Sequence, residues 1–411
     1  MTGVERLPGL THPAWVEVDL SALVTNARVL RRAVPAAARL GLLVKANGYG
    51  HGLEMAARAA LAGGADQLIV AALDEALALR DAGVEASILV VYPTPPDAVG
   101  DAVRADLEMS VSGLASARQT LTAWARQREL LPGQVLPLHV EVDTGMGRGG
   151  VAPDDLVELV GMIDRQRATS IVGIWSHLAV GSDQATSGEQ ARRFEAALAT
   201  VAATGRRIPP RHLVATEGIF AASAPAYEMV RVGLAFYGEL GLEFQPEPAT
   251  ASLAAELRPA MTVKARPVRL ETMPSGASVG YGREWIAVRP SLVATLPIGY
   301  SDGWTRAYWP GASALVRGRR VPLIGRVSMD SVCADVTDVG DVTMEDEFVL
   351  LGGQGGERIT PNELARLRRS IPNEVFCAFG PRLPRVYFAD DRIVSTSHQA
   401  DRVERVAGAQ W

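Results

Sequence analysis

The first 240 residues alternate short β-forming runs with longer segments rich in alanine, leucine and arginine, and this alternation constrains the fold more than any other feature. The strand-like runs number eight and occupy residues 40–45, 67–72, 87–92, 107–112, 137–143, 171–177, 211–216 and 228–235. Helix-like segments such as GEQARRFEAALATVAATG, which ends in a helix-stopping glycine, separate most of them. Eight βα units predict an α/β fold, a (β/α)8 TIM barrel over residues 1–245. A doubly wound open sheet uses the same alternation, but eight units without a central break favour the barrel.

The character of the sequence changes after about residue 245. LEFQPEPATASLAAELRP is a proline-bearing transition, and the strand-like runs beyond it, such as SLVATLPIGY, are separated by glycine and proline turns. Few helix-like segments precede PNELARLRRS. The sequence therefore predicts a second, mostly β domain over residues 246–411, and 411 residues are comfortable for two domains.

Composition and charge exclude several classes of protein. A chain with 48% hydrophobic and 21% charged residues has an ordinary globular composition, and its net charge of -5 gives no reason to expect a nucleic acid or an anionic membrane as partner. Two cysteines form no disulfide framework, which favours a reduced compartment. The N-terminus lacks the features of a signal peptide, and no run of about 18 apolar residues occurs. We therefore expect a cytoplasmic protein without a metal site.

Lysine is nearly absent from the chain, which makes its two occurrences informative. Lys and Arg together number 41, yet only Lys45 and Lys264 are lysines. Arginine stays protonated, whereas lysine can lose its proton and act as an amine nucleophile. Lys45 stands in LVKANGYGHG, where an apolar run gives way to a glycine-broken turn, so it is predicted to end the first barrel strand. We therefore expect Lys45 to serve chemistry rather than general charge.

Residues that follow the strands of such a barrel meet at one rim, where the active sites of this fold lie. The chemically useful residues expected there are Lys45, Arg148, His177, Thr216, Arg231 and Gly233. Phosphate sites in barrels use the loops after strands seven and eight, which here offer the Thr216 hydroxyl and the backbone near Gly233. A lone amine beside a phosphate site predicts pyridoxal 5'-phosphate (PLP) held as a Schiff base.

Each of these residues also has an ordinary structural explanation. Lys45 could pair with a carboxylate, and His177 alone is more often a hydrogen-bonded structural histidine. His139 lies within a predicted strand and is interpreted as a packing residue. GMGRGG has the glycine spacing of a dinucleotide-binding turn, but it follows the fifth strand and lacks the acidic residue about 20 positions further on, so we reject that interpretation.

Eight motifs in order make the chain resemble the alanine racemases, PLP enzymes of the barrel type known as fold type III. They are VKANGYGHG, VDTGMGRGG, SHLA, RVGLAFYG, VGYGREW, IGYSDGW, GRVSMD and PRLPRVY. The resemblance covers about residues 14 to 390. It implies a barrel followed by a β domain, a small amino-acid substrate, and a homodimer whose active sites take residues from both chains.

The resemblance assigns the two catalytic bases. Lys45 would hold PLP and act on one face of the substrate, and Tyr281, contributed by the partner subunit, would act on the other. Racemization removes the α-proton from one face and returns one to the opposite face, so two groups are needed. Tyrosine has an ordinary pKa of about 10 and is a poor base at neutral pH. His177 would therefore tune Tyr281 through a hydrogen bond.

The same resemblance assigns the other site residues. Arg231 would face the PLP ring nitrogen and, because arginine keeps its protons, leave that nitrogen unprotonated, while His212 would hold Arg231 in place. Arg148 would lie near the PLP phenolate and the substrate carboxylate. The other expected cofactor-binding residues are Tyr49, Thr216, Gly233, Leu234 and Tyr237. The other expected substrate-binding residues are Met329, Tyr300 and Pro381.

Several positions depart from the family pattern. An asparagine and a serine are usual where this chain has Ala215 and Thr216, so only the hydroxyl is kept. Glu141 stands where many members carry a carbamylated lysine that orients the arginine, and its carboxylate supplies the same negative charge. Ser328 replaces a cysteine. Pro381 stands where a tyrosine reaches the phosphate and walls the substrate pocket, which puts the substrate in doubt more than the reaction type.

Two other functions remain as alternatives. A fold type III decarboxylase usually carries a His-x-Gly-Ser-Gly signature and a cysteine-bearing motif, whereas this chain has SHLAVG and Ser328. A non-catalytic PLP-binding protein of this fold is typically a single barrel, and the attached β domain with Tyr281 argues against it. The leading prediction is therefore an amino-acid racemase with alanine as the default substrate and broadened or altered specificity.

Overall fold

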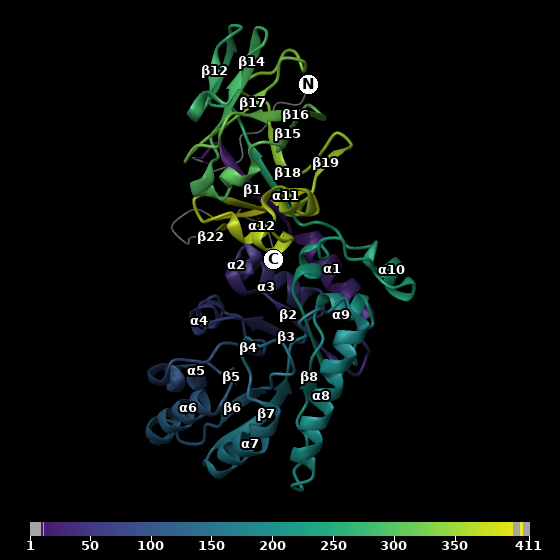
Figure 1. Ribbon diagram of the computed structural model, residues 1–411. Helices are drawn as coiled ribbons and strands as arrows, with labels where there is room; N and C mark the ends of the chain where they lie inside the picture. Colours follow the sequence, from purple (N-terminus) through teal and green to yellow (C-terminus); the bar gives the residue numbers. More distant parts are fainter. Residues whose placement is uncertain (1–9, 11, 398–402, 406–411) are drawn as a thin grey trace. The chain divides into compact units, whose positions relative to one another are not determined.

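The computed structural model describes residue 10, residues 12–397 and residues 403–405 (Figure 1). The chain divides into two compact units. One, here called the barrel unit, comprises Leu23–Gly48 and Leu53–Arg258. The other, here called the β unit, comprises the described residues up to Ala22, the short segment Tyr49–Gly52, and the described residues from Pro259 onward.

Eight parallel strands close the barrel, as the alternation of the sequence predicts. They are β2 (Arg39–Leu43), β3 (Gln67–Val70), β4 (Ile88–Val90), β5 (Leu107–Val111), β6 (Leu136–Glu141), β7 (Thr169–Trp175), β8 (Arg211–His212) and β9 (Met229–Val232). Closure comes from the parallel pairing of β9 with β2. Every predicted strand is found, although β8 is only two residues long because the chain turns into helix α9 soon after it. The prediction of a TIM barrel is confirmed, and an open sheet is excluded.

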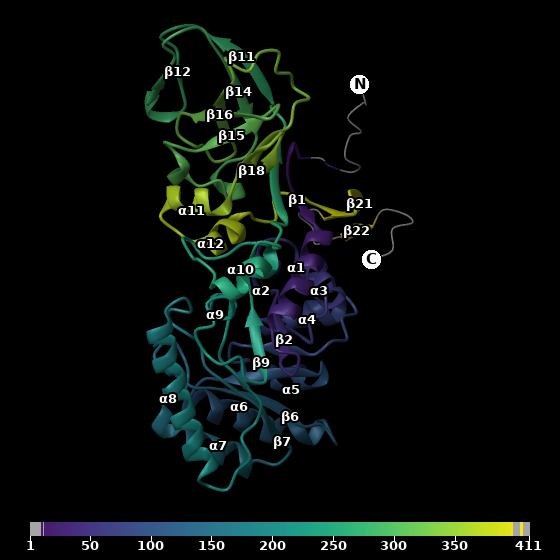
Figure 2. The ribbon, with the colours of Figure 1, turned by 90° about the vertical axis from the view of Figure 1, so that its right-hand side faces the viewer.

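Helices lie around the outside of these strands (Figures 1 and 2). The α-helices are α1 (Leu20–Ala33), α2 (Lys45–Tyr49), α3 (Leu53–Ala62), α4 (Leu73–Asp81), α5 (Val99–Arg104), α6 (Leu114–Gln127), α7 (Leu156–Arg165), α8 (Gln184–Ala202), α9 (Thr216–Phe220) and α10 (Pro248–Ala254). Short 3-10 turns are η1 (Pro96–Ala98), η2 (Arg128–Leu130), η3 (Pro153–Asp155) and η4 (Leu234–Tyr237). The longest helix, α8, begins where the Asp183 side chain accepts a hydrogen bond from the Thr186 N–H, an ordinary N-cap. Ile69, Leu89 and Met229 form a buried apolar cluster between three of the strands.

The β unit is mostly β-sheet, as predicted, and most of its strand pairs are antiparallel. Its strands are β1 (Ala14–Asp19), β10 (Met261–Ala265), β11 (Arg269–Met273), β12 (Ser278–Val279), β13 (Trp285–Ile286), β14 (Ser291–Leu296), β15 (Ser313–Val316), β16 (Arg319–Ile324), β17 (Val332–Asp335), β18 (Phe348–Gln354), β19 (Glu357–Ile359), β20 (Arg385–Ala389), β21 (Arg392–Ser397) and β22 (Val403–Arg405). The main sheet has the order β11-β14-β17-β16-β15-β18-β10-β1-β20-β21-β22. Its helical segments are η5 (Tyr281–Arg283), η6 (Tyr300–Asp302), η7 (Arg306–Tyr308), α11 (Pro361–Arg368) and α12 (Pro372–Ala378).

The N-terminal strand β1 belongs to this sheet, which the sequence analysis did not predict. It pairs antiparallel with β10 and parallel with β20. The side chains of Ala14, Trp15, Val16 and Val18 are buried. A strand at the start of the chain is therefore an interior element of the β unit.

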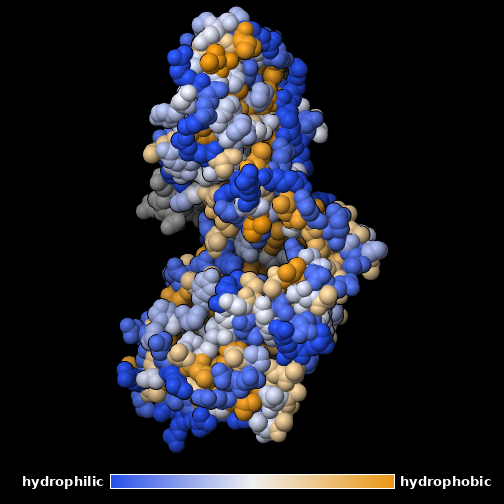
Figure 3. Space-filling model, viewed as in Figure 1, coloured by the Kyte–Doolittle hydropathy of each residue, from blue (hydrophilic) through white to orange (hydrophobic). Residues whose placement is uncertain are grey.

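Hydrophilic side chains predominate on the face drawn in Figure 3, with apolar ones in small patches between them. Among the described residues, no helix combines the length and the apolar character needed to cross a membrane.

Candidate active site

Lys45 lies at the start of a left-handed turn where the chain leaves β2. The strand ends at Leu43, two residues earlier than predicted, and Ala46, Asn47 and Gly48 have φ values of 53°, 53° and 60°. The Glu75 side chain holds this turn, because its Oε1 accepts a hydrogen bond of 2.6 Å from the Ala46 N–H. Successive left-handed residues are unfavourable for L-amino acids, and such strain is concentrated at functional sites.

The structure distinguishes the two lysines of the chain. Lys264 lies in β10, with its Nζ 2.9 Å from Glu17 and 3.1 Å from Glu347. Burial lowers the pKa of Lys264, but these two carboxylates outweigh it and raise the pKa above its usual value. Lys264 is therefore a charged partner in an ion-pair cluster. Lys45 lies close to His177 and is one of the positive charges that lower the pKa of this histidine.

His177 is held neutral in a positively charged environment. Burial is the main reason that its pKa falls to about 3, and the positive charges of Arg231, Arg148 and Lys45 lower it further. Four of the predicted site residues therefore lie close enough to interact electrostatically; they are His177, Arg231, Arg148 and Lys45. A neutral imidazole can accept one hydrogen bond and donate another, so His177 can orient a hydroxyl group.

Arg231 is almost fully buried and is fixed on three sides. Its Nη1 lies 2.7 Å from His212 Nδ1, and its Nη2 donates a 2.7 Å hydrogen bond to the Ser176 carbonyl. Its guanidinium also stacks over the Trp175 ring at 4.7 Å. Burial is the main reason that the pKa of Arg231 falls to about 9. The predicted pairing of His212 with Arg231 is thus present in the structure.

Glu141, at the end of β6, is the buried carboxylate of this group. Burial raises its pKa, which a hydrogen bond with Ser112 and the positive charges of Arg148 and Arg231 counteract. Its Oε2 lies near the chain at Gly149, where a Cβ would be only 3.2 Å away. Glu141 therefore sits beside the Arg148 loop, where its charge attracts that arginine.

The loops after β8 and β9 meet at Thr216. The Thr216 Oγ1 accepts a hydrogen bond of 3.3 Å from the Gly233 N–H, which joins the start of α9 to the end of β9. Tyr237 is fully buried, and its hydroxyl donates a 2.9 Å hydrogen bond to the Leu43 carbonyl, two residues before Lys45. Thr216, Gly233 and Leu234 thus lie in two joined loops, while Tyr237 supports the strand that carries Lys45.

The other predicted site residues belong to the β unit. Tyr49 is buried there, and its pKa is raised mainly by burial. Tyr281 is 67% exposed, between two glycines with positive φ. Exposed tyrosine and methionine side chains also occur at Tyr300 and Met329. Pro381 is exposed as well.

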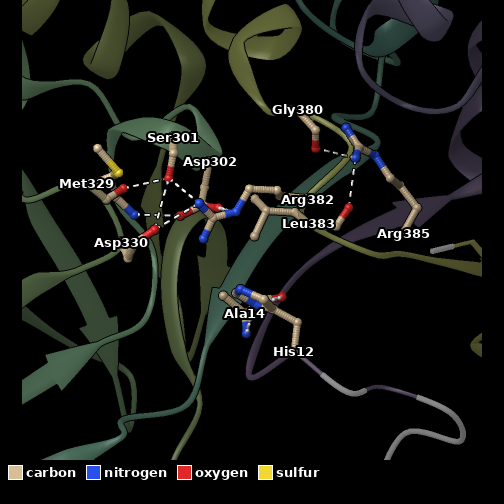
Figure 4. Close-up of polar contacts among 11 residues, drawn as sticks. His12, Ala14, Ser301, Asp302, Met329, Asp330, Gly380, Arg382, Leu383 and Arg385 are labelled. Carbon is tan, nitrogen blue, oxygen red and sulfur yellow. Dashed lines mark hydrogen bonds and ion pairs between the residues drawn. The ribbon is translucent and has the colours of Figure 1, made fainter. Parts of the chain in front are cut away.

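Arg382 ties three loops of the β unit together (Figure 4). Its Nε lies 3.0 Å from the buried Asp302, and its Nη1 lies 2.8 Å from Asp330. Ser301 bridges the same loops by donating a 2.7 Å hydrogen bond to the Met329 carbonyl. The predicted substrate residues Tyr300, Met329 and Pro381 are each next to one of these tied residues, so the structure brings their backbone segments together.

Two further polar residues of the barrel are linked by hydrogen bonds to the predicted site residue His212. His139 was interpreted as packing and Glu108 was not considered, yet His139 lies 2.9 Å from His212 and 2.6 Å from Glu108. A signal existed in the sequence, because His139 is two positions before Glu141 and alternate residues of a strand share a face. A histidine and a glutamate on the same face of one barrel strand indicate a polar interior there.

The donor set of the barrel fits PLP. A primary amine at Lys45 can hold an aldehyde, and the Thr216 hydroxyl with nearby backbone N–H groups suits a phosphate. The positive charges of Lys45, Arg148 and Arg231 suit a doubly negative cofactor and a substrate carboxylate. A barrel of this kind joined to a β unit defines the class of fold type III PLP enzymes.

Comparison with known proteins identifies the family. Residues 18–241 match the family described as "Alanine racemase, N-terminal domain" and residues 260–387 match "Alanine racemase, C-terminal domain". The chain belongs to the alanine racemase family. It is an isomerase, an amino-acid racemase whose cofactor is PLP, and the decarboxylase and non-catalytic alternatives are not favoured.

Relatives match nearly the whole chain. The alanine racemase of Symbiobacterium thermophilum is 39% identical over 92% of this chain and 97% of its own length. The crystal structure of alanine racemase from Bacillus anthracis with bound L-Ala-P has a TM-score of 0.87 at 27% identity, covering 95% of this chain and 99% of that chain. A histidine racemase from Leuconostoc mesenteroides has a TM-score of 0.82 at 27% identity, covering 93% and 99%.

Proposed function

We propose that this protein interconverts L- and D-alanine and also accepts larger side chains, with two bases acting on opposite faces of the substrate. The observation that carries the proposal is the position of Lys45, one of only two lysines, at the end of a barrel strand beside a neutral histidine and two arginines. Relatives named alanine racemase over nearly the whole chain support alanine as the substrate.

PLP, when bound, withdraws electrons from the substrate α-carbon and so makes its proton removable. Lys45 holds the cofactor and moves the proton on one face through its Nζ. Tyr281 of the partner subunit moves the proton on the other face through its hydroxyl, which a neutral His177 orients. Arg148, attracted by Glu141, binds the substrate carboxylate.

The remaining residues bind and position. Arg231, held by His212, would be the residue at the ring nitrogen of the cofactor. Thr216, Gly233 and Leu234, together with Tyr49 and Tyr237, would hold its phosphate. Tyr300 and the Met329 backbone contact the substrate. The division of the chain at residue 245 into a cofactor-binding domain and a domain with the second base is part of the same proposal.

Pro381 broadens the choice of substrate in this proposal. Proline has no hydroxyl and less bulk than the tyrosine of the family pattern, so it restricts the pocket less. A protein of the same fold that is named a histidine racemase supports the view that this architecture accommodates larger side chains. A pocket with room for an added methylene discriminates by only about 1–3 kcal/mol, so we expect a graded preference.

The proposal includes a homodimer in the cytoplasm. The 67% exposure of the Tyr281 side chain supports a role at a subunit interface. The two cysteines, Cys333 and Cys377, are not joined in a disulfide, which supports a reducing compartment.

A chiral assay tests the proposed function. Purified protein with PLP is incubated with a panel of L-amino acids, and D-enantiomers and amines are separated by chromatography. We expect D-alanine and smaller amounts of larger D-amino acids. Amine products without D-enantiomers would show a decarboxylase instead.

A further inference from the structure

Four polar side chains on β5, β6, β8 and β9 form one continuous hydrogen-bonded chain inside the barrel, here called the Arg231–Glu108 relay. Arg231 Nη1 lies 2.7 Å from His212 Nδ1, His212 Nε2 lies 2.9 Å from His139 Nδ1, and His139 Nε2 lies 2.6 Å from Glu108 Oε2. The three basic residues are each at most 5% exposed.

A glycine on the intervening strand β7 makes the relay possible. A Cβ at Gly173 would lie 2.2 Å from His139 Nδ1 and 2.5 Å from its Cε1. The register between β6 and β7 also shifts at Leu138/His139. His139 therefore reaches His212 only because β7 carries no side chain at this point. Both local features serve the contact between the two imidazoles.

The protons of the relay can run in only one direction. A guanidinium only donates, so His212 Nδ1 accepts from Arg231, and a neutral His212 must carry its proton on Nε2. His212 Nε2 then donates to His139 Nδ1, which leaves the His139 proton on Nε2, facing Glu108. A doubly protonated His139 would donate at both nitrogens, and His212 cannot accept at both of its own. Burial lowers the pKa of His212 well below its usual value, which agrees with a neutral ring.

Glu108 fixes the far end of the relay. Burial opposes ionisation, but hydrogen bonds from His139, Ser87 and Gln67 outweigh it and lower the pKa of Glu108 below its usual value. Ser87 Oγ and Gln67 Nε2 each donate to it at 2.8 Å. Its carboxylate is therefore ionised, is held in place, and can only accept from His139.

We propose that Glu108 and His139 are positioning residues for Arg231: they fix the tautomer of both imidazoles, and so fix the orientation and polarisation of the guanidinium that faces the cofactor ring nitrogen. The inference rests on the proposed role of Arg231. Without the anchoring carboxylate, both tautomers of His139 become accessible. A His212 ring with its proton on Nδ1 would then oppose the Arg231 N–H and displace the guanidinium.

Glu108→Gln tests the proposal, because glutamine keeps the shape and can either accept from or donate to His139. Nitrogen-15 NMR of histidine-labelled protein, assigned with single substitutions, reports each tautomer without requiring activity. We expect His139 and His212 each to show one tautomer in the wild type, with the proton on Nε2, and mixtures in Glu108→Gln. We also expect a shift of the cofactor absorption maximum and a fall in kcat on the order of tenfold, the usual size for outer hydrogen-bonding partners at metal sites. KM should stay within about twofold, because Glu108 is not placed against the substrate.

Matched variants separate positioning from simple stabilisation. Glu347→Gln removes a partly buried, ion-paired carboxylate of the β unit and should leave the tautomers and the absorption maximum unchanged. Gly173→Ala displaces the His139 ring while retaining the Glu108 charge and should reproduce the spectral shift. Wild-type rings with the proton on Nδ1 would overturn the proposal, and so would unchanged tautomers and absorption in Glu108→Gln. If the wild type racemizes no amino acid, the proposed function fails, and the NMR result still decides the relay.

Discussion

Ala46 occupies a left-handed backbone position that glycine would adopt at lower cost. Its φ is 53° and ψ 51°, and it is followed by two more residues in the same conformation. The Ala46 side chain is exposed, so removing its methyl group sacrifices little packing. The substitution Ala46→Gly therefore isolates the backbone strain next to Lys45.

The expected magnitude follows from two opposing effects. The left-handed conformation costs a residue with a Cβ about 1–2 kcal/mol. Glycine loses more conformational entropy on folding than alanine does, which offsets about 0.5–1 kcal/mol of this gain in the free energy of unfolding. Ala46→Gly should therefore raise the free energy of unfolding by up to about 1.5 kcal/mol. The Ala46 N–H remains bonded to Glu75, so cofactor binding should be retained.

Gly48→Ala provides the control of opposite sign. Its φ is 60°, and an added Cβ would lie 2.8 Å from the Ala56 Cβ. Overpacking of this kind typically costs about 1–3 kcal/mol in addition to the backbone strain. Urea unfolding followed by circular dichroism measures both variants, with unchanged m-values as the condition for comparison. If Ala46→Gly destabilises the protein, the turn is not strained at this position and the reasoning is refuted.

Four further predictions concern the site. Borohydride should fix PLP to a peptide containing Lys45, and label on Lys264 would contradict the assignment. Lys45→Ala and Tyr281→Ala should each be nearly inactive, and mixing them with subunit exchange should restore activity, since a mixed dimer has one intact site; exchange without recovery would place the site within one chain. Pro381→Tyr should shift kcat/KM back toward alanine from larger side chains, and a wild type that already rejects everything larger would show that Pro381 does not line the pocket. The pKa of His177 is about 3 in the folded protein, so the folded state binds fewer protons than the unfolded state below the ordinary pKa of about 6.5. The free energy of unfolding should therefore decrease as the pH is lowered below about 6.5, and the loss should reach about 2 kcal/mol at pH 5. Urea unfolding of the cofactor-free protein should show a weaker pH dependence for His177→Gln than for the wild type.

The barrel was predictable because each of its strands is an apolar run followed by a helix with its own periodicity. Because both faces of these strands are buried, each strand appears in the sequence as a continuous apolar run and can be recognised without knowledge of its partners. β1 escaped prediction because its partners, β10 and β20, lie more than 240 residues away and no local pattern reveals them. The end of β8 could not be predicted, because the apolar run continues beyond the two residues that pair with neighbouring strands.

The position of Lys45 was predictable to within two residues, but its backbone was not. Left-handed φ values at Ala46 and Asn47 depend on the Glu75 contact, which joins residues 29 apart. The hydrogen bonds of His139 escaped prediction for a related reason, because the sequence does not show that Gly173 and His212 face this histidine. Both the backbone conformation after Lys45 and the hydrogen bonds of His139 depend on contacts between residues far apart in the sequence.

Conversion of the two enantiomers of alanine into each other can be measured from both directions. L-alanine and D-alanine are supplied separately to the wild-type protein with PLP in deuterium oxide, and products are followed by chiral chromatography and mass spectrometry. We predict that both reactions converge on equal amounts of the two enantiomers carrying deuterium at the α-carbon, and that Lys45→Ala abolishes both. The proposed racemization would be contradicted if ethylamine formed. It would also be contradicted if the folded protein with bound cofactor left the starting enantiomer unconverted.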